Sequence, residues 1–532
     1  PAAVQDIDVI KGPTSALFGN FALSGIVNVH TLERVNDTQA IVDAGTAGHV
    51  DATLLTGFDH ASSGGGVFGV RWQHEDGWRP NSRYDIGQGH FRVVHDLSPS
   101  IRIDGGVELY GTKWQSPGFL SEDEFANRQY DIVSNPTDGG QKYHAQERLS
   151  LRVLTGSMLW RSTVYSTQGN WNFFLTIPPA GGRFEGSGSQ TQEVDHRTGV
   201  GATSALTWPL ARGDVTVGAE GRWDQSHFQN WSTTDRVRDS AATLVDARQS
   251  SGALFVQSSF DLTSRLRFNL GGRYDLIGTR STPDQDTSSS GSHGVFSPKL
   301  GALVRLTRDV GLYGNVSRGF RSTDGVISDP TLPFITEWAY ESGLKVHHNQ
   351  VHGSVAFFRM DVSNEQTFDP FTGASSNGGA SRRQGVEIEL HTPVAPALTL
   401  SADWTFNDAR YSRLIVPSDE DPAEADTLSG LRVYNTAQYI GVAALDFALP
   451  SASWRVRVSS NVTGPYSPFD EPGVVLPAYA LLHLSGFLRV GSSQLQLGLR
   501  NLLNKAYPEL VAGHVVSPGP PRSVYGTIRY SF

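Results

Sequence analysis

The sequence predicts an all-β protein, a 22-stranded antiparallel transmembrane β-barrel with a short N-terminal segment that is not part of the barrel wall. Three observations predict it. Apolar and polar side chains alternate with a period of two, short turns alternate with mostly long loops, and the chain ends on an aromatic strand. This combination is typical of outer-membrane barrels.

The alternation is clearest near the C-terminus. Leu495, Leu497 and Leu499 share one face of segment 494–500, while Gln496 and Arg500 share the other. Segments 299–306, 454–462 and 523–532 alternate in the same way. A wide barrel has a hydrocarbon side and a wet lumen, so we expect Arg455, Arg457, Gln496 and Arg500 to face the lumen.

The connections give the strand count. Ten short connections alternate with eleven others, which gives twenty-one connections and 22 strands. About 23 residues are then available for each strand and its connection, and a membrane strand needs about 9–11. The short connections are 61–66, 98–100, 155–158, 208–213, 262–264, 307–309, 347–350, 394–397, 450–453 and 491–493. The others are 48, 77–83, 115–142, 171–190, 230–245, 280–293, 321–335, 364–380, 412–432, 466–476 and 506–520.

A β-propeller or β-solenoid is the alternative interpretation of many short strands, but such folds repeat a sequence unit and we find no repeat of 40–50 residues.

The composition and the missing motifs exclude several classes of function. The net charge of −10 argues against a nucleic-acid partner, and the absence of cysteine excludes disulfides and thiolate chemistry. No G-x-S-x-G, H-E-x-x-H or phosphate-loop motif occurs, so we expect no enzyme, no catalytic residues and no cofactor.

The two ends of the chain carry further signals. Tyr530 and Phe532 lie on one face of the last strand, as expected for a barrel-closing strand at the membrane interface. The first 32 residues contain two short strands, at 7–10 and 26–31, separated by glycine-rich turns.

The stretch IDVIKGPTSALFGNFALSGIVNVHT (7–31) resembles the end of the plug domain of TonB-dependent outer-membrane receptors. The matching motif residues are Lys11, Gly12, Pro13, Phe18, Gly19, Gly25 and Asn28. Later segments resemble successive parts of the barrel of that family, namely FSPKLGALVRL (296–306), LYGNVSRGFR (312–321), YESGLK (340–345), RRQGVEIEL (382–390) and RNLLNKAY (500–507).

The resemblance implies that residues 1–32 are the C-terminal remnant of a plug domain and residues 33–532 the transmembrane barrel. It implies a monomeric receptor in a Gram-negative outer membrane, in contact with lipid and lipopolysaccharide. Such a receptor imports a scarce metal chelate, foremost a ferric siderophore, or cobalamin. The TonB complex would act through an N-terminal segment missing from these 532 residues. A passive pore or adhesin barrel without energised gating remains the alternative.

Ligand contacts are expected among aromatic and basic residues in or near the long loops. The aromatic candidates are Trp114, Phe119, Trp171, Phe173, Phe174, Phe184, Trp231 and Phe334, and Arg318, Arg321 and Arg383 would attract an anionic chelate. Membrane girdles use the same aromatic residues, and lumen arginines also pair with plug carboxylates. The segment after residue 321 lacks the FRAP and NPNL motifs of haem receptors, which favours a siderophore.

Two sequence clusters contain residue types that bind metals. His347, His348 and His352 lie at a short turn, and residues 418–426 form an acidic run in a long loop. Solvated turns and loops have the same composition, so we expect no metal site at either place.

Overall fold

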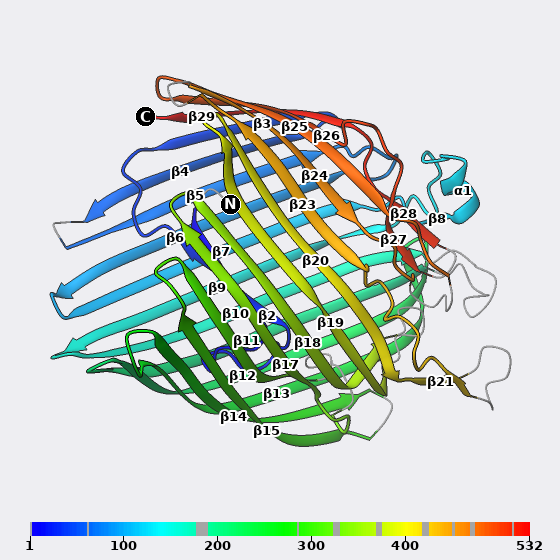
Figure 1. Ribbon diagram of the computed structural model, residues 1–532. Helices are drawn as coiled ribbons and strands as arrows, with labels where there is room; N and C mark the ends of the chain where they lie inside the picture. Colours follow the sequence, from blue (N-terminus) through cyan, green and yellow to red (C-terminus); the bar gives the residue numbers. More distant parts are fainter. Residues whose placement is uncertain are drawn as a thin grey trace.

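The computed structural model describes residues 3–60, 63–176, 190–284, 287–322, 330–368, 375–417, 425–449, 453–468, 474–512 and 515–532. Within these ranges, 22 antiparallel strands form one closed barrel (Figure 1). Each strand pairs with its sequence neighbours in the wall, and the last strand pairs with the first. The predicted fold class and strand number are confirmed.

The first eleven barrel strands precede the middle of the chain. They are β3 (Gln39–Gly45), β4 (Val50–His60), β5 (Gly64–Glu75), β6 (Tyr84–Ser98), β7 (Ile101–Gln115), β9 (Gly139–Thr155), β10 (Met158–Thr176), β11 (Gln190–Leu210), β12 (Gly213–Thr234), β13 (Val237–Asp261) and β14 (Leu266–Pro283).

The remaining eleven complete the wall. They are β15 (Ser289–Arg305), β16 (Val310–Arg321), β17 (Ile335–His348), β18 (Val351–Phe368), β19 (Ser375–Ala395), β20 (Leu398–Arg413), β23 (Tyr439–Phe447), β24 (Trp454–Thr463), β25 (Tyr479–Val490), β26 (Ser493–Arg500) and β29 (Ser523–Ser531). Each of the ten predicted short turns joins two of these strands.

One connection is much shorter than its sequence suggested. Residues 230–245 are polar and were expected to form a long loop, but β12 and β13 stay paired up to Thr234 and Val237. Asp235 and Arg236 form the turn with φ values of 48° and 69°, the left-handed backbone of tight hairpin turns. Backbone pairing with the adjacent strand therefore overrides the loop-like composition.

Side chains alternate between the two faces of the wall as predicted. Leu497 is 69 % exposed on the outward face of β26, where it would meet hydrocarbon. Its neighbour Gln496 lies on the other face and donates a hydrogen bond to Tyr525 Oη over 3.1 Å. Arg500 stacks on the same tyrosine ring, 4.7 Å from the centroid.

The long connections carry small elements of their own at one end of the barrel (Figure 1). β8 (Leu120–Ser121), β27 (Pro508–Ala512) and β28 (Val515–Pro518) form a three-stranded sheet next to the short helix α1 (Glu122–Ala126), and β21 (Ile415–Pro417) pairs with β22 (Ala425–Thr427). Within the described ranges, no helix has the length and apolar character needed to cross a bilayer.

The N-terminal segment (residues 3–32) lies inside the ring of strands, in deep blue in Figure 1. Its strands β1 (Val4–Lys11) and β2 (Gly25–Thr31) form a separate two-stranded sheet. Its polar contacts reach the wall at β6, β13, β14, β15, β17 and β19. Contacts in so many directions place the segment within the lumen.

The two faces of β26 give a matched test of the wall. We expect Leu497→Arg to lower the free energy of unfolding in lipid vesicles by about 2–4 kcal/mol, since the charge would enter hydrocarbon. Gln496→Arg, one residue away but facing the lumen, should change it little. The measurement is urea unfolding followed by the electrophoretic shift of the folded barrel. Equal losses for both variants would contradict the assignment of faces.

Candidate functional site in the lumen and at its mouth

The turn after β1 is held by wall strands β13 and β15, which lie on either side of β14. Lys299 of β15 is buried, and its Nζ donates a hydrogen bond to the carbonyl oxygen of Pro13. Gln257 of β13 accepts hydrogen bonds from the backbone N–H of Ala16 at 3.0 Å and from Ser15 Oγ at 3.2 Å. The turn that contains Pro13 of the predicted plug motif is therefore held against the wall by polar side chains.

Arg273 of β14 is the most deeply buried charge at this contact, with 2 % of its side chain exposed. Its guanidinium lies 2.8 Å from Asp275 and 2.9 Å from Glu220, and it donates to the carbonyl of Leu17 over 3.4 Å. A Cβ at Gly19 would lie 2.4 Å from Arg273 Nε, so a larger residue there would have to displace the guanidinium from its present position. The buried charge is compensated by two carboxylates and covered by the segment.

A third contact lies on β16 and β17. Ser24 Oγ donates to Glu337 Oε2 over 3.3 Å, and Asn20 exchanges two 2.8 Å hydrogen bonds with Ser322. A Cβ at Gly319 would lie 2.8 Å from Pro13 Cβ, which shows how closely the segment packs on the backbone of β16.

Lys11 reaches the wall at β19, where its Nζ lies 2.7 Å from Glu387 and 2.5 Å from Glu389. Burial opposes the charged form, but the hydrogen bonds to both carboxylates hold the pKa of Lys11 above its ordinary value of 10.5. A raised pKa means that this tether contributes fully below the ordinary lysine value and weakens as pH rises through the raised one.

The end of β2 is held by Arg92 of β6. Its guanidinium donates to the carbonyl of Thr31 and contacts Glu33 at 3.1 Å and Asp104 at 2.5 Å. Arg102 also pairs with Glu33, at 3.2 Å. The segment is thus anchored on opposite parts of the wall, near β6 and near β13 to β19.

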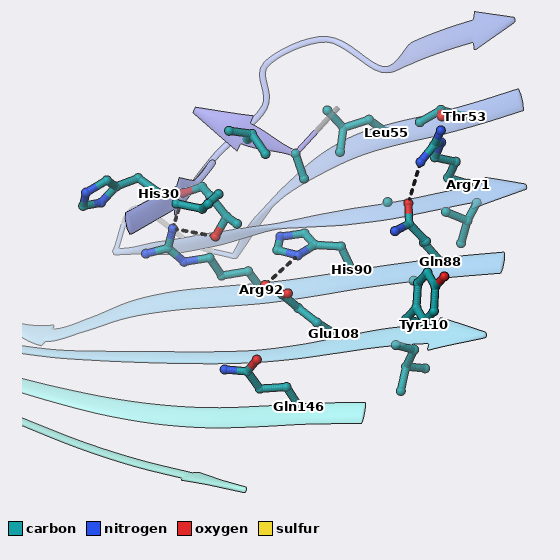
Figure 2. Close-up of a pocket in the computed structure, with 18 of the residues that line it drawn as sticks. His30, Thr53, Leu55, Arg71, Gln88, His90, Arg92, Glu108, Tyr110 and Gln146 are labelled. Atoms are coloured by element: carbon teal, nitrogen blue, oxygen red, sulfur yellow. Dashed lines mark hydrogen bonds and ion pairs between the residues drawn. The ribbon is translucent and has the colours of Figure 1, made fainter. Parts of the chain in front are cut away.

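A cavity of about 790 Å³ remains between β2 and strands β4 to β9. Side chains from the neighbouring wall strands β4, β5, β6, β7 and β9 line it, and Figure 2 shows Arg71, Gln88, His90 and Tyr110 among them. Arg71 donates to Gln88 over 2.9 Å, and His90 faces Glu108 at 3.7 Å. The volume suits a small ligand, and polar and apolar side chains contribute about equally to the lining.

Three of the predicted ligand contacts meet at the mouth, on the lumen face of β7 and β10. Trp114 packs edge-on against Trp171 with ring centroids 6.2 Å apart, and Phe173 packs on Trp171 at 5.0 Å. Lys142 Nζ lies 5.0 Å from the centre of the Trp171 ring. Among the described residues the buried Trp171 Nε1–H has no acceptor, so this aromatic cluster can offer a ligand one hydrogen bond.

The loops around the mouth are organised by buried polar side chains. Arg79 donates to the carbonyls of Gly118, Tyr130 and Ile132 at 2.8–3.1 Å, and burial lowers its pKa. Fully buried Asp138 accepts hydrogen bonds from Thr176 and Gln190, which joins the ends of β10 and β11 to the loop after β7.

The other predicted ligand residues lie elsewhere. Phe174 and Trp231 lie on the outward face, stacked with Arg236 and Arg238 at 4.9 and 4.4 Å. Phe334 is buried against Phe320, Ile277 and Val295, and Arg318 of β16 donates to the carbonyl of Phe296. Arg321 is the last residue of β16, and Phe119 lies just before β8. Arg383 forms an ion pair with Glu365. Phe184 is outside the described residues.

The remaining plug-motif residues lie in the N-terminal segment. Gly12 and Gly25 have φ values of 67° and 150°, and Asn28 Nδ2 lies 2.8 Å from His30 Nε2. Phe18 lies in the turn between β1 and β2. The side-chain ligand atoms of Asp6, Asp8 and His30 lie within 4.8 Å of one another, a grouping that the sequence did not reveal.

The histidine cluster lies at the short turn between β17 and β18, as expected. His347 Nδ1 lies 2.7 Å from His352 Nδ1, and His348 pairs with Asp309 at 2.8 Å. Residues 418–424 of the acidic run are outside the described residues.

A family model described as "TonB dependent receptor-like, beta-barrel" matches residues 71–502. The chain therefore belongs to this family, whose fold and relatives are those of outer-membrane receptors and transporters rather than enzymes. The family membership and the 22-stranded barrel together place the protein in the outer membrane.

Individual relatives are distant. The metal-pseudopaline receptor CntO of Pseudomonas aeruginosa (strain UCBPP-PA14) is 25 % identical over 51 % of this chain and 39 % of its own length. The match thus spans about two-fifths of that relative. The vitamin B12 transporter BtuB of Vibrio vulnificus (strain YJ016) is 22 % identical over 100 % of this chain and 80 % of its own. The siderophore receptor PiuA from Acinetobacter baumannii has the same fold, with a TM-score of 0.86, 14 % identity and coverage of 100 % and 86 %.

The anchors of the segment should differ in strength. We expect Arg273→Met to lower the free energy of unfolding by about 3–5 kcal/mol, because it leaves Asp275 and Glu220 without their buried partner. Lys11→Met should cost less than about 1 kcal/mol, since that pair is half exposed. Urea unfolding gives the values, and hydrogen exchange of residues 13–24 should accelerate in the Arg273 variant. Similar effects of both substitutions would contradict this ranking.

Proposed function

We propose that the protein is a TonB-dependent receptor that imports a scarce metal chelate, foremost a ferric siderophore, and that residues 1–32 are the C-terminal remnant of its plug domain. The observation that carries the proposal is the N-terminal segment held inside the barrel by Arg273, Lys299 and Lys11. A lumen of 22 strands is too wide for wall side chains to fill, so a folded stopper is needed to prevent leakage.

The mouth supports a chelate as the ligand. Trp114, Trp171 and Phe173 offer flat apolar surfaces, and Lys142 adds a positive charge beside them. Aromatic faces bind planar or aryl groups, and the cation attracts an anionic complex. The relatives named for metal-pseudopaline and vitamin B12 are receptors or transporters of metal complexes, which agrees with this ligand class.

The mechanism that we propose has three steps. The long loops and the aromatic cluster capture the chelate, which is then enclosed between the loops and the plug. The TonB complex, acting on residues N-terminal to this chain, then pulls the plug and weakens its contacts with the wall. The cavity beside β2 would become the path to the periplasm. We further propose that the receptor is a monomer surrounded by lipid and lipopolysaccharide.

Energised uptake can be tested in cells. A strain lacking its own receptors and expressing the intact gene should grow on one member of a panel of radiolabelled ferric siderophores and cobalamin. The same strain without TonB should accumulate no label above background. Equal uptake in both strains would favour a passive pore, and binding to host surfaces without uptake would favour an adhesin barrel.

The aromatic cluster can be tested on the same chelate. We expect Trp171→Ala to weaken binding by about tenfold, because a buried aromatic contact and an indole donor are lost. Trp338→Ala, on the outward face of β17, is the matched control and should bind as the unsubstituted protein does. The measurement is quenching of intrinsic fluorescence on titration of the chelate. Unchanged affinity of the Trp171 variant would exclude this part of the mouth.

A further inference from the structure

The outward face of β18, β19 and β20, together with Arg432 in the connection before β23, carries a group of charged residues that the receptor function does not use. We name it the outer arginine patch. Its members are Arg359, Asp361, Arg382, Asp408, Arg410 and Arg432. Three of its four arginines are nearly half exposed, with 46–48 % of the side chain accessible.

Strand register places the patch directly above the apolar belt. Phe357, Val386, Phe406 and Tyr439 lie opposite one another across four neighbouring strands and form the last apolar row. The rings of Trp404, Phe406 and Tyr439 lie 6.2–6.3 Å apart at this edge, as in an interfacial girdle.

On β18, β19 and β20 the next two rows toward the long loops are polar, while the same rows end on Tyr340 and Trp338 in the adjacent β17. The first consists of Arg359, Gln384 and Asp408, and the second of Asp361, Arg382 and Arg410. Alternate residues of a strand are about 6.6 Å apart. Arg359 therefore lies two residues, about 6.6 Å, beyond the apolar row, and Arg382 and Arg410 lie four residues, about 13 Å, beyond it, at the level where lipid headgroups meet the protein.

The charges within the patch are ordered but not balanced. Asp361 contacts both Arg359 and Arg382 at 2.9 Å. Asp408 contacts Arg410 at 3.0 Å and Arg432 at 3.7 Å. Each aspartate thus holds two guanidinium groups in place, and these six residues carry a net charge of +2.

The strand register makes this excess of positive charge destabilising unless an anion is bound. Arg382 and Arg410 are directly opposed across β19 and β20, and like charges in that position destabilise a sheet. The two aspartates compensate only half of the positive charge. An anion that contacts both guanidinium groups would remove the repulsion and would find its donors already oriented.

We infer that the outer arginine patch binds a phosphate group of lipid A, the membrane anchor of lipopolysaccharide. Position selects a lipid over a soluble anion, because acyl chains of a bound lipid would lie on the apolar row formed by Phe357 and Phe406. Guanidinium groups match phosphate by paired hydrogen bonds. The inference deepens the lipid partner proposed above and does not depend on the imported ligand.

Lipid binding can be measured on the full chain purified in detergent. Hexa-acylated bisphosphorylated lipid A is titrated and retained lipid is counted by native mass spectrometry. We expect Arg382→Gln combined with Arg410→Gln to weaken binding by about tenfold, given the usual gain per arginine at an anionic surface. The control is Arg265→Gln combined with Arg308→Gln, two exposed arginines in the short turns at the opposite rim, and it should bind normally.

Further arms identify the source of the phosphate. Lipid A without its phosphates should bind the unsubstituted protein and the Arg382/Arg410 variant with the same affinity. Inorganic phosphate at the same concentration should not displace lipid A. Equal binding by both double variants, or full displacement by inorganic phosphate, would overturn the inference. Uptake of the imported ligand is measured in parallel, so failure here remains distinct from failure of the proposed function.

Discussion

Closure of the backbone hydrogen-bond ladder is the constraint on which the rest of the structure depends. Hydrocarbon cannot satisfy a free N–H or C=O group, so the wall must have no open edge. Pairing of β29 with β3 removes that edge and joins the two ends of the 22-stranded meander. A ring of this size encloses a wide wet space. The charged lumen, the inserted N-terminal segment and the need for buried anchors all follow from closure.

The anchors show how a removable element can be held inside a permanent wall. Arg273 keeps its carboxylate partners Asp275 and Glu220 on the wall itself, and it offers the segment only one long hydrogen bond. Lys299 likewise contacts a backbone carbonyl rather than a charged side chain of the segment. Most of the strong electrostatics is therefore internal to the barrel. Departure of the segment would break the Lys11 pairs with Glu387 and Glu389 together with its hydrogen bonds to the wall, but it would leave the Arg273 pairs with Asp275 and Glu220 intact.

Sequence reasoning predicted the wall well, since alternation and turn composition are local signals. It predicted the lumen less well. Arg273 and Glu220 are 53 positions apart, and only the register across β12, β13 and β14 brings them together. Lys299 lies within a segment that resembles the family, but nothing local marks it as an anchor. Trp231 was expected in a loop, but β12 extends past it, with a bulge between Asn230 and Trp231. Its position in the strand directs its side chain to the outward face.

The small sheet formed by β8, β27 and β28 has a mechanical consequence for the mouth. Only two residue pairs, Val515 with Ser121 and Val516 with Leu120, join β28 to β8. They connect the loop after β7 to the loop before β29, across the ends of the four barrel strands β3 to β6 that lie between β29 and β7. The two loops must therefore swing together, or this short seam must part before either moves alone. These two residue pairs therefore couple the two loops at this sector of the entrance.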